Sequence, residues 1–356
     1  LQTVREKLPF PGILGHVCTH PCELHCKRLE LDRAIRIRDI KRFLAEAENG
    51  DPEHILKIAP ARAQRVAVVG SGPAGLIAAH DLRREGFEVT LIEREEKIGG
   101  CLTYRIPGWR LPAVVRDRDL TIIDALGIEV RTGVELGSDL SLAELRADHD
   151  VVLLATGFAG GQGLLRAGVE GIRATVRDTI HADPESCETG VEGLFAAGDA
   201  VSGPTSVIDA MALGRRAADS IRCVLDDAPL AGAGRVDEPP ALLWELGIDE
   251  AERRRRERTP NLLEPAPAPM TDKEVRGEAE RCLDCTCDRC VRDCEFLAAH
   301  CSSPRDLARL VKQGIDGHLE TVYSCNVCGL CATLCPVDLD TGELMLAARR
   351  EAVRRG

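Results

Sequence analysis

The stretch Arg65–Gly75, RVAVVGSGPAG, decides the fold of the central part of the chain. An apolar run typical of a buried parallel strand leads directly into the pattern Gly70-x-Gly72-x-x-Gly75, after which a helical pattern begins. Glycines at these positions permit a tight turn, let the backbone approach a pyrophosphate and let the helix pack on the strand. Glu93 ends the next apolar run, where an acidic side chain can accept hydrogen bonds from a ribose diol. The segment therefore predicts a dinucleotide site of the Rossmann type.

The same alternation of strand and helix continues outward from this stretch, from Arg65 to about Asp227. Short apolar runs alternate with helical runs, which predicts an α/β fold with a parallel sheet. A basic amphipathic helix is also expected before it, over Ala34–Ala47. The predicted strands of the sheet are Val66–Val69, Val89–Ile92 and Val151–Leu154, and its predicted helices are Leu76–Glu85 and Ala210–Leu225.

The composition narrows the class of protein. The 356 residues carry a formal net charge of −12 and only 3% aromatic residues, which disfavours a broad nucleic-acid surface and a stacking platform for single strands. No uncharged apolar run reaches the roughly 18 residues of a membrane helix, and no signal-peptide pattern opens the chain. We therefore expect a soluble cytoplasmic protein with no membrane span and no nucleic-acid partner. Because the chain begins with Leu1 rather than methionine, we also expect a further segment upstream.

Cysteine is clustered rather than scattered. Three of the sixteen cysteines lie at positions 18, 22 and 26, and ten lie between positions 282 and 335. In a chain without an export signal, such clusters indicate metal ligands rather than a disulfide framework.

The most specific cysteine pattern is Cys325-x2-Cys328-x2-Cys331-x3-Cys335, followed by Pro336, which is the ferredoxin-type spacing for a [4Fe–4S] cluster. Three thiolates of such a loop reach one cubane, and the fourth often ligates a neighbouring cluster. We therefore expect Cys294 to complete the first cluster, and Cys301 to be spare. Zinc is the alternative, since four thiolates with these spacings also suit a tetrahedral site, but the run ending in Cys-Pro favours iron–sulfur. In the second cluster, Cys335 would join three of the four upstream cysteines, Cys282, Cys285, Cys287 and Cys290.

The N-terminal cysteines Cys18, Cys22 and Cys26 are spaced so that a helix would carry them on one face. A cubane needs a fourth ligand, and no other cysteine is near in the sequence. The alternatives are a nearby histidine, a ligand upstream of the chain, or no cluster at all and three buried thiols. The candidate histidines are His16, His20 and His25.

Two later segments indicate which dinucleotide binds. Val151–Gly157, VVLLATG, and Gly193–Asp199, GLFAAGD, are each a strand that ends in a small-residue turn. The arrangement resembles the two-part FAD domain of the glutathione-reductase-like flavoproteins, in which the ATG turn and the GD aspartate contact the flavin nucleotide. By this resemblance, Asp199 would hold the ribityl or pyrophosphate end, and FAD is favoured over NAD.

Two features of those flavoproteins are missing from this sequence. Only 33 residues separate Gly157 from Val191, which leaves no room for the NAD(P)-binding domain that the class inserts there. Cys101 follows two glycines near the expected flavin but has no second cysteine beside it, so disulfide reduction is disfavoured. We expect Cys101 to be a packing residue near the flavin.

The residues also resemble a more specific family, the glutamate synthase small-subunit-like FAD oxidoreductases. The resemblance rests on REKLPFPGILGHVCTHPCELHCK at 5–27, GSGPAGL at 70–76, IGGCLTYRIPGWRLP at 98–112 and GLFAAGDAVSGPTSVIDAMALGRRAA at 193–218. It implies N-terminal [4Fe–4S] clusters that exchange electrons with FAD. The C-terminal part, 281–297 and 324–350, is similar to ferredoxin domains of heterodisulfide-reductase-related proteins. NAD(P)H oxidation and glutamate synthesis are not expected to carry over, because the NAD(P)H domain is missing.

These patterns predict four regions along the chain. They are an N-terminal helical iron–sulfur segment (1–62), a Rossmann-like FAD-binding domain of glutathione-reductase type (63–227), a linker (228–270) and a C-terminal α-helical ferredoxin-like domain with two [4Fe–4S] clusters (271–356). The predicted cofactor-binding residues are Gly70, Ser71, Gly72, Pro73, Ala74, Gly75, Glu93, Arg94, Gly100, Cys101, Thr156, Gly157, Gly198 and Asp199. The predicted metal ligands are Cys18, Cys22, Cys26, Cys282, Cys285, Cys287, Cys290, Cys294, Cys325, Cys328, Cys331 and Cys335.

The function expected from this sequence is that of an oxidoreductase subunit of an anaerobic complex, which relays electrons between FAD and [4Fe–4S] clusters. The expected partners are other subunits of the redox complex, a ferredoxin or an NAD(P)H-binding subunit. Three alternatives are an NAD(P)H-dependent oxidoreductase whose nicotinamide site lies on a partner chain, a catalytic subunit whose substrate reaches the flavin near Cys101–Arg110, and a scaffold that holds no FAD. The glycines, Glu93 and Asp199 together argue against the scaffold.

Overall fold

A computed structural model shows two compact units. The first comprises Leu1–Glu23, Ile35–Ala233 and Thr259–Ala279, and the second comprises Leu24–Ala34, Gly234–Arg258 and Glu280–Gly356. The residues that the structure describes are 4–5, 8–24, 26, 33–47, 57–169, 171–228, 268–281, 291, 294–301, 304, 307, 318–328, 330–331 and 340–355. Most of the predicted linker 228–270 lies outside them. Among the described helices, none is both long and apolar enough to cross a lipid bilayer.

The first unit is built on a five-stranded, all-parallel sheet in the order β3-β2-β1-β4-β5. The strand order reverses between β1 and β4, and a ligand site is expected at such a switch point, at the carboxyl ends of the strands. The strands are β1 (Arg65–Val69), β2 (Glu88–Glu93), β3 (Glu129–Thr132), β4 (Val151–Leu154) and β5 (Leu194–Ala196).

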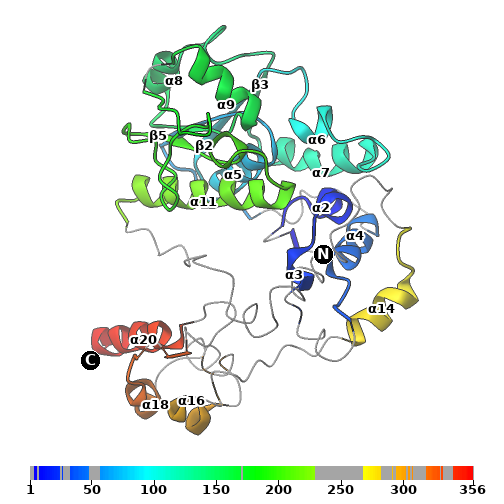
Figure 1. Cartoon of the computed structure of the whole chain (residues 1–356). Helices are drawn as coiled ribbons and strands as arrows, with labels where there is room; N and C mark the ends of the chain where they lie inside the picture. Colours follow the sequence, from blue (N-terminus) through cyan, green and yellow to red (C-terminus); the bar gives the residue numbers. More distant parts are fainter. Residues whose placement is uncertain are drawn as a thin grey trace. The chain divides into compact units, whose positions relative to one another are not determined.

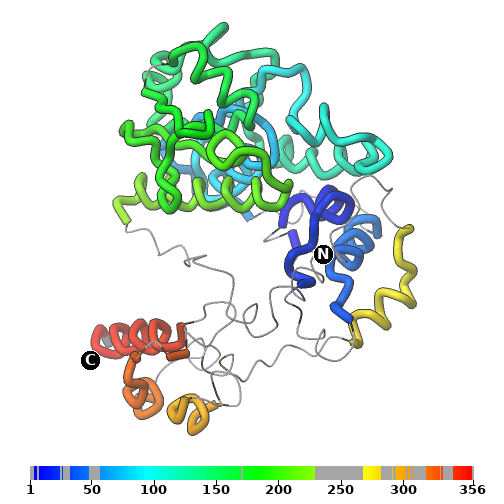
Figure 2. The backbone as a smooth tube through the Cα atoms, viewed as in Figure 1, coloured from blue at the N-terminus to red at the C-terminus, as the bar shows by residue number. Residues whose placement is uncertain are grey.

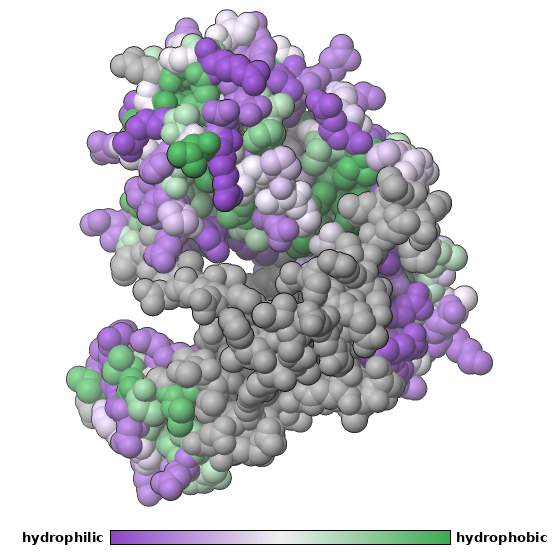
Figure 3. Space-filling view, in the orientation of Figure 1, coloured by the Kyte–Doolittle hydropathy of each residue, from purple (hydrophilic) through white to green (hydrophobic). Residues whose placement is uncertain are grey.

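Helices cover both faces of this sheet, as the traces in Figures 1 and 2 show. One face shares an apolar core with α5 (Pro73–Arg84), α7 (Ala113–Ala125) and α11 (Val207–Leu225), and α2 (Pro11–Val17) joins this core through contacts with α7 and α11. The other packs against α8 (Leu142–Asp148), α9 (Gly157–Arg166) and α10 (Asp199–Ser202). Because both faces are buried, the central strands are apolar on both sides, and this is why they are continuous apolar runs in the sequence. On the outer surface drawn in Figure 3, hydrophilic side chains predominate over this unit, with smaller apolar areas between them.

The α/β fold predicted from the sequence is confirmed. Helix α5 begins at Pro73, three residues before its predicted start, because proline is favoured at the first helical position. Helix α11 begins directly behind the N-cap Ser206, whose Oγ accepts a hydrogen bond from the Asp209 N–H at 3.3 Å. Strand β3 was not predicted, since its sequence EVRT lies at the sheet edge and is largely exposed, without the apolar run of a buried strand.

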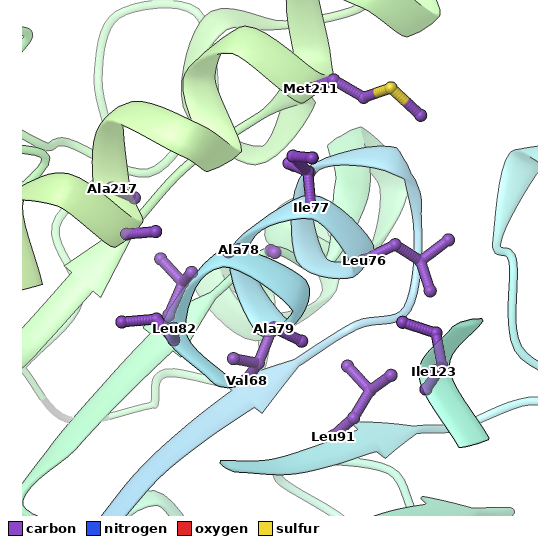
Figure 4. Close-up of a cluster of buried hydrophobic side chains, with 14 of the residues drawn as sticks. Val68, Leu76, Ile77, Ala78, Ala79, Leu82, Leu91, Ile123, Met211 and Ala217 are labelled. Carbon is purple, nitrogen blue, oxygen red and sulfur yellow. The ribbon is translucent and has the colours of Figure 1, made fainter. Parts of the chain in front are cut away.

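Helices α5 and α11 pack closely through small residues. A Cβ atom on Gly214 of α11 would lie 2.1 Å from the backbone oxygen of Ala74 in α5. Figure 4 shows α5 between the strands and α11, with Leu76, Ala79 and Leu82 among the side chains that fill the space around it. The position of α5 is therefore held by backbone contact on one side and by the sheet on the other.

The N-terminal helices belong to the same unit as the sheet. Helix α2 lies against α4 (Ile37–Glu46), where a Cβ atom on Gly15 would come within 2.7 Å of Arg42. On its other side, the backbone N–H of Ile13 donates to the Asp119 carboxylate of α7 at 2.7 Å. Helix α14 (Asp272–Glu280) joins this unit through Glu278, which accepts a hydrogen bond from the backbone N–H of Arg36.

The described helices of the second unit are short apart from the last one. They are α16 (Glu295–His300), α18 (Leu319–Ser324) and α20 (Thr341–Arg355). A small apolar core contains Leu297, Leu307, Met345 and Cys331. The side chains of Cys294, Cys301 and Cys325 pack against it.

The close contact between α5 and α11 yields a test. The substitution Gly214→Ala should destabilise the sheet unit by roughly 1–3 kcal/mol or more, because the added methyl forces the two helices apart. The matched control is Gly163→Ala in α9, where a Cβ atom meets nothing within 4 Å and alanine should stabilise the helix by about 0.5–1 kcal/mol. Thermal unfolding of the full chain, followed by circular dichroism, measures both. Equal stability of the two variants would contradict the packing.

Candidate functional site

A cavity of about 550 Å³ opens at the switch point of the sheet. Its walls come from the turn after β1, the end of β2, the turn after β4 and the start of α11. Three of the residues predicted to bind a cofactor, Ser71, Gly75 and Gly198, do not line it, and their packing is described below. The others do line it: Gly70, Gly72, Pro73, Ala74, Glu93, Arg94, Gly100, Cys101, Thr156, Gly157 and Asp199.

The three glycines of the first turn have different roles. Gly70 has φ +102°, and a Cβ atom there would lie 2.4 Å from the backbone oxygen of Ala155. A Cβ atom on Gly75 would lie 1.8 Å from the backbone oxygen of Gly70, so only glycine allows α5 to approach β1. At Gly72 a Cβ atom meets nothing within 4 Å, and Gly72 lines the cavity. Gly70 and Gly75 thus shape the turn, whereas Gly72 leaves space above it.

Ser71 ties three segments together behind the cavity wall. Its N–H and its hydroxyl donate to Oε2 of Glu93 at 2.9 and 2.5 Å, and its oxygen atoms accept from the Gly99 N–H. The Oε1 atom of Glu93 accepts from the N–H of Glu95 at 3.0 Å. Glu93 is 6% exposed, so its carboxylate is held in place by the protein while it faces the cavity. These contacts position Glu93 at the rim where the sequence predicted a ribose-binding acid.

The next segment approaches the glycine turn closely. Gly100 has φ +52°, and a Cβ atom there would lie 2.8 Å from Cα of Gly72. Cys101 follows at the start of α6 (Cys101–Tyr104) and lines the cavity. Burial, with the negative charge of Asp199 as a second cause, raises the pKa of the Cys101 thiol to about 11. The thiol is therefore protonated near neutral pH, which does not suit a nucleophile.

The opposite wall holds Asp199 and the start of α11. The Oδ1 atom of Asp199 accepts hydrogen bonds from the N–H and the hydroxyl of Thr205, at 3.2 and 2.6 Å. Thr205, Ser206, Val207 and Ala210 line the cavity, so the N-terminus of the 19-residue helix α11 faces it, as does that of α5. Helix N-termini favour negative charge through their unpaired N–H groups. The negative end of a ligand would be stabilised at either place.

One buried polar atom in this wall has no partner. The hydroxyl oxygen of Thr156 is buried without a hydrogen bond in the described residues. Thr156 precedes Gly157, which has φ +70° at the start of α9. A buried hydroxyl without a partner is unfavourable, so a ligand atom in the cavity would satisfy it. This atom and the space above Gly72 are compatible with a dinucleotide in the cavity.

Several residues of the cavity were missed from the sequence. Ser206 could have been found as an N-cap before an apolar helical run. Tyr104 and Arg105 lie in the segment Cys101–Arg110, which was named only as an approach for a substrate. Other lining residues carry no local signal, because only the fold places them here, and they include Val134, Glu135, Leu136, Phe158, Leu164, Thr205, Val207 and Ala210. Gly198, which was predicted, lies behind the wall, where a Cβ atom would be 2.7 Å from Cβ of Ala74.

The segment between β4 and β5 contains no second nucleotide domain in its described residues. It holds α9 and two isolated bridges, Ala174–Ile180 and Glu188–Phe195, and the five-stranded sheet accounts for every strand of the described ranges. This agrees with the short spacing noted in the sequence.

The N-terminal cysteines do not share one helix. Cys18 ends α2 in an extended conformation, and Cys22 lies on the next helix, α3 (Pro21–Leu24). The break comes at His20, which has φ +45°, and at Pro21, which cannot continue a helix. The backbone N–H of His20 lies 3.3 Å from Sγ of Cys18 and donates to it. Cys26 falls in the second unit, and His25 lies outside the described residues.

The surroundings of these cysteines contain both cations and acids, and Arg42 is paired with Glu46. Burial raises the pKa of the Cys22 thiol, against the opposing effect of Lys41, and burial lowers the pKa of His16. Arg110 is only 4% exposed, and its Nε and Nη2 atoms are buried without a hydrogen-bond partner in the described residues. Burial lowers the pKa of Arg110, and so do the positive charges of Arg38 and Arg42. Buried donor atoms without a partner are costly, so the surroundings of Arg110 would favour an anionic group.

The C-terminal cysteine loop repeats the geometry at Cys18. Val327 has φ +52°, and its backbone N–H donates to Sγ of Cys325 at 3.4 Å. Cys294, Cys301, Cys325 and Cys331 border the same apolar core, and Cys328 is exposed. The thiol of Cys301 donates to the backbone oxygen of Leu297.

The metal ligands remain predictions. Among the described side chains, no three His, Cys, Asp or Glu groups converge as a metal site would require. The remaining predicted ligands lie outside the described residues: Cys282, Cys285, Cys287, Cys290 and Cys335.

Family models match the chain in two places. Residues 68–116 match the NAD(P)-binding Rossmann-like domain, and residues 281–340 match the 4Fe-4S dicluster domain. The chain thus combines a Rossmann-like domain with an iron–sulfur domain, as predicted. Zinc is disfavoured for the C-terminal cysteines by the second match.

Curated proteins similar to this chain are subunits of oxidoreductases. NADPH-Fe(3+) oxidoreductase subunit beta of Geobacter sulfurreducens is 34% identical over 190 residues, 49% of this chain and 28% of that protein. NADP(+)-dependent formate dehydrogenase subunit beta of Moorella thermoacetica is 32% identical over 193 residues, 48% of this chain and 27% of that protein. NAD-dependent dihydropyrimidine dehydrogenase subunit PreT of Salmonella typhimurium is 33% identical over 165 residues, 46% of this chain and 40% of that protein.

This chain is related to oxidoreductase subunits. The matches therefore confirm the broader prediction, a small-subunit-like oxidoreductase with an iron–sulfur domain, and the three named relatives are not glutamate synthases. The chain spans less than half the length of each of these relatives.

The raised pKa of Cys101 yields a second test. At pH 8 only about one Cys101 thiol in a thousand should be ionised, so iodoacetamide should alkylate it about 100-fold more slowly than glutathione in the same solution. The rate should rise as the pH approaches 11, because the thiolate is the reactive form. Mass spectrometry of the peptide that contains Cys101 measures the reaction. Alkylation as fast as that of glutathione would show that Cys101 is an activated thiol.

Proposed function

We propose that this chain is an electron-relay subunit that binds FAD in the cavity and carries [4Fe–4S] clusters that pass electrons to partner subunits. The observation that carries the proposal is the cavity itself, which joins two helix N-termini, an anchored acid and an unpartnered hydroxyl at the switch point of the sheet. The match of residues 281–340 to the 4Fe-4S dicluster domain supports the iron–sulfur part of the relay. When bound, FAD supplies exchange of electrons singly or in pairs, and the clusters supply single-electron transfer.

The residues around the cavity would divide the binding of FAD among them. Gly72 and the N-terminus of α5 would accommodate the pyrophosphate, since the backbone is open there. Glu93, fixed by Ser71, would accept hydrogen bonds from the adenosine ribose. Asp199, fixed by Thr205, would contact the ribityl or pyrophosphate end, and Thr156 would bond a neighbouring polar atom.

The N-terminus of α11 and the residue Cys101 would meet the other end of the cofactor. The helix terminus offers unpaired N–H groups where negative charge is favoured. Cys101 remains a neutral thiol that fills the wall without reacting. Arg94 lines the outer rim, where its guanidinium lies 3.4 Å from a carboxylate oxygen of Glu95 and 3.7 Å from one of Glu135.

For the N-terminal cluster, we propose Cys18, Cys22 and Cys26 as three of the ligands. The fourth ligand is not identified. Two observations support this. The N–H of His20 donates to Sγ of Cys18, as Val327 does to Cys325 in the domain that matches iron–sulfur proteins. The buried guanidinium of Arg110 and the cations of α4 would balance the negative charge of a thiolate-bound cluster.

The proposed C-terminal clusters keep the crossed assignment, with Cys294, Cys325, Cys328 and Cys331 in one and Cys335 with three of the upstream cysteines in the other. The proposed division of the chain also keeps the boundaries predicted from the sequence, namely 1–62, 63–227, 228–270 and 271–356. We further propose that the chain works in an anaerobic cytoplasm and that its partners are other subunits of a redox complex.

A second candidate is an NAD(P)H-dependent oxidoreductase whose nicotinamide site lies on a partner chain. The names of the three relatives include NAD or NADP(H), and the description of the matched Rossmann model names NAD(P), which favour this candidate. The segment between β4 and β5 has no room for such a site on the described part of this chain.

The open space at Gly72 allows FAD binding to be tested apart from folding. The substitution Gly72→Ala should leave thermal stability of the cofactor-free chain unchanged, because a Cβ atom there meets no protein atom within 4 Å. It should weaken FAD binding about tenfold or more, because the methyl occupies the place of the pyrophosphate. Flavin fluorescence titration measures the affinity. The control is Gly163→Ala in α9, outside the cavity lining, which should bind FAD as the wild type does. Unchanged affinity in Gly72→Ala would count against a dinucleotide at this turn.

The source of electrons is tested by anaerobic mixing of the flavin-loaded chain with NADH, NADPH or dithionite. We expect dithionite alone to bleach the flavin absorbance, because the described part of the chain has no nicotinamide domain. Rapid bleaching by NADH or NADPH would reject the relay in favour of the NAD(P)H oxidoreductase.

A further inference from the structure

Helix α20 contacts the C-terminal cysteine loop at both ends of the loop. At its start, Asp340 Oδ1 accepts from the Gly342 N–H at 2.7 Å and lies 3.5 Å from Sγ of Cys331. A Cβ atom on Gly342 would lie 3.4 Å from Cα of Val327. Two turns further on, Arg349 reaches the other end of the loop. The helix extends beyond residue 340, where the match to the iron–sulfur family model ends.

Arg349 bridges two backbone carbonyl groups. Its Nε donates to the oxygen of Val322 at 3.0 Å, and its Nη2 donates to the oxygen of Cys325. The guanidinium also lies over the ring of Tyr323, 5.4 Å from the centroid. All three partners are at the end of α18, which lies beside α20 within the second unit (Figure 1). A single side chain thus holds the last turn of α18 and the first cysteine of the loop.

The positive charge of Arg349 is not balanced by an acid among the described residues. The ion pairs recorded for α20 link Arg354 with Glu351 and do not include Arg349. Arg349 is half-buried, so solvent screens its charge only in part. A charge in this position lies beside the residue that the ferredoxin spacing assigns as the first cluster ligand.

Arginine often caps a helix C-terminus, and this role alone would explain the bond to Val322. The second bond extends this cap to the carbonyl group of Cys325, the C-cap residue, which the ferredoxin spacing assigns as the first ligand of the loop. The guanidinium reaches the two carbonyl oxygens with two different nitrogen atoms held in a rigid fork, whereas a lysine has its three donors on one nitrogen.

We propose that Arg349 is a positioning residue for the [4Fe–4S] cluster of Cys325, Cys328 and Cys331, which holds Cys325 in place and supplies a positive charge that favours the reduced cluster. The proposal rests on the proposed function, since it needs that cluster. On reduction the cluster gains one electron from its donor and one unit of negative charge, and no bond to Arg349 forms or breaks. A nearby positive charge stabilises the more negative state and raises the reduction potential.

The test of the charge is the variant Arg349→Gln in the full, reconstituted chain, reduced anaerobically by dithionite at set potentials and followed by electron paramagnetic resonance. At a fixed potential, the ratio of reduced to oxidised cluster should fall about tenfold, a shift of about 59 mV for one electron. The shift should affect one of the two C-terminal cluster signals only. The matched control is Arg350→Gln, the next residue, which is exposed and should leave both signals unchanged. A potential equal to that of the wild type in Arg349→Gln would overturn the electrostatic part.

The variant Arg349→Lys distinguishes the effect of the positive charge from the effect of the hydrogen bonds that hold Cys325. It keeps the charge, so its potential should stay near that of the wild type, and a tenfold change in the ratio would contradict the electrostatic part. It lacks the fixed fork that presents Nε and Nη2 to the two carbonyl oxygens, so it should hold Cys325 less firmly, and an iron chelator should remove iron faster than from the wild type. An unchanged rate of iron loss would overturn the positioning part.

Loss of iron in Arg349→Gln, with helix content retained by circular dichroism, would support the positioning part, and Arg349→Lys would then decide the electrostatic part. The failure of the proposed function would look different, because the wild-type chain itself would then hold no [4Fe–4S] signal.

Discussion

The close contact of α5 with the backbone on either side is the constraint on which the rest of the first unit depends. Gly75 lets the helix approach the Gly70 carbonyl, and Gly214 of α11 lets a second helix approach Ala74. With α5 fixed in this way, its N-terminus faces the cavity, and Ser71 is placed to hold both Glu93 and the segment at Gly99. The backbone packing of α5 therefore sets the position of the cavity, and the residues of the cavity walls supply the polar contacts around it.

Charge is distributed unevenly in a chain whose net charge is −12. In the first unit, the buried Arg110 lies near Arg38 and Arg42 of α4, and Lys41 of the same helix lies near Cys22. In the second unit, Arg349 donates to the cysteine loop. The same local geometry recurs in both units, where a residue in the left-handed region donates its N–H to the sulfur of the cysteine two positions before it. Both features are typical of sites for negatively charged thiolate groups.

The sequence predicted the central strands and the glycine turn because these depend on local patterns. Strand β1 and helix α5 combine an apolar run, three glycines and a proline, each with its own local physical reason. The edge strand β3 was missed because it is exposed and has no such run. The N-terminal cysteine spacing suggested one helix face, but Pro21 and the left-handed His20 divide it into two segments. The spacing of the cysteines alone could not show this break between the two helices.

By itself, the sequence determined the α/β class, the dinucleotide turn, the acid at the end of β2 and the cysteine spacing, because each is a matter of residue type at a short separation. Only the tertiary structure decided which distant residues share the cavity, such as Thr205 and Ser206 with Gly72, and which charged groups meet the cysteine loops. Arg349 illustrates the difference. It is 24 positions from Cys325, in a helix with no motif to mark it, and only the packing of α20 against α18 brings the guanidinium to the carbonyl group of the ligand residue.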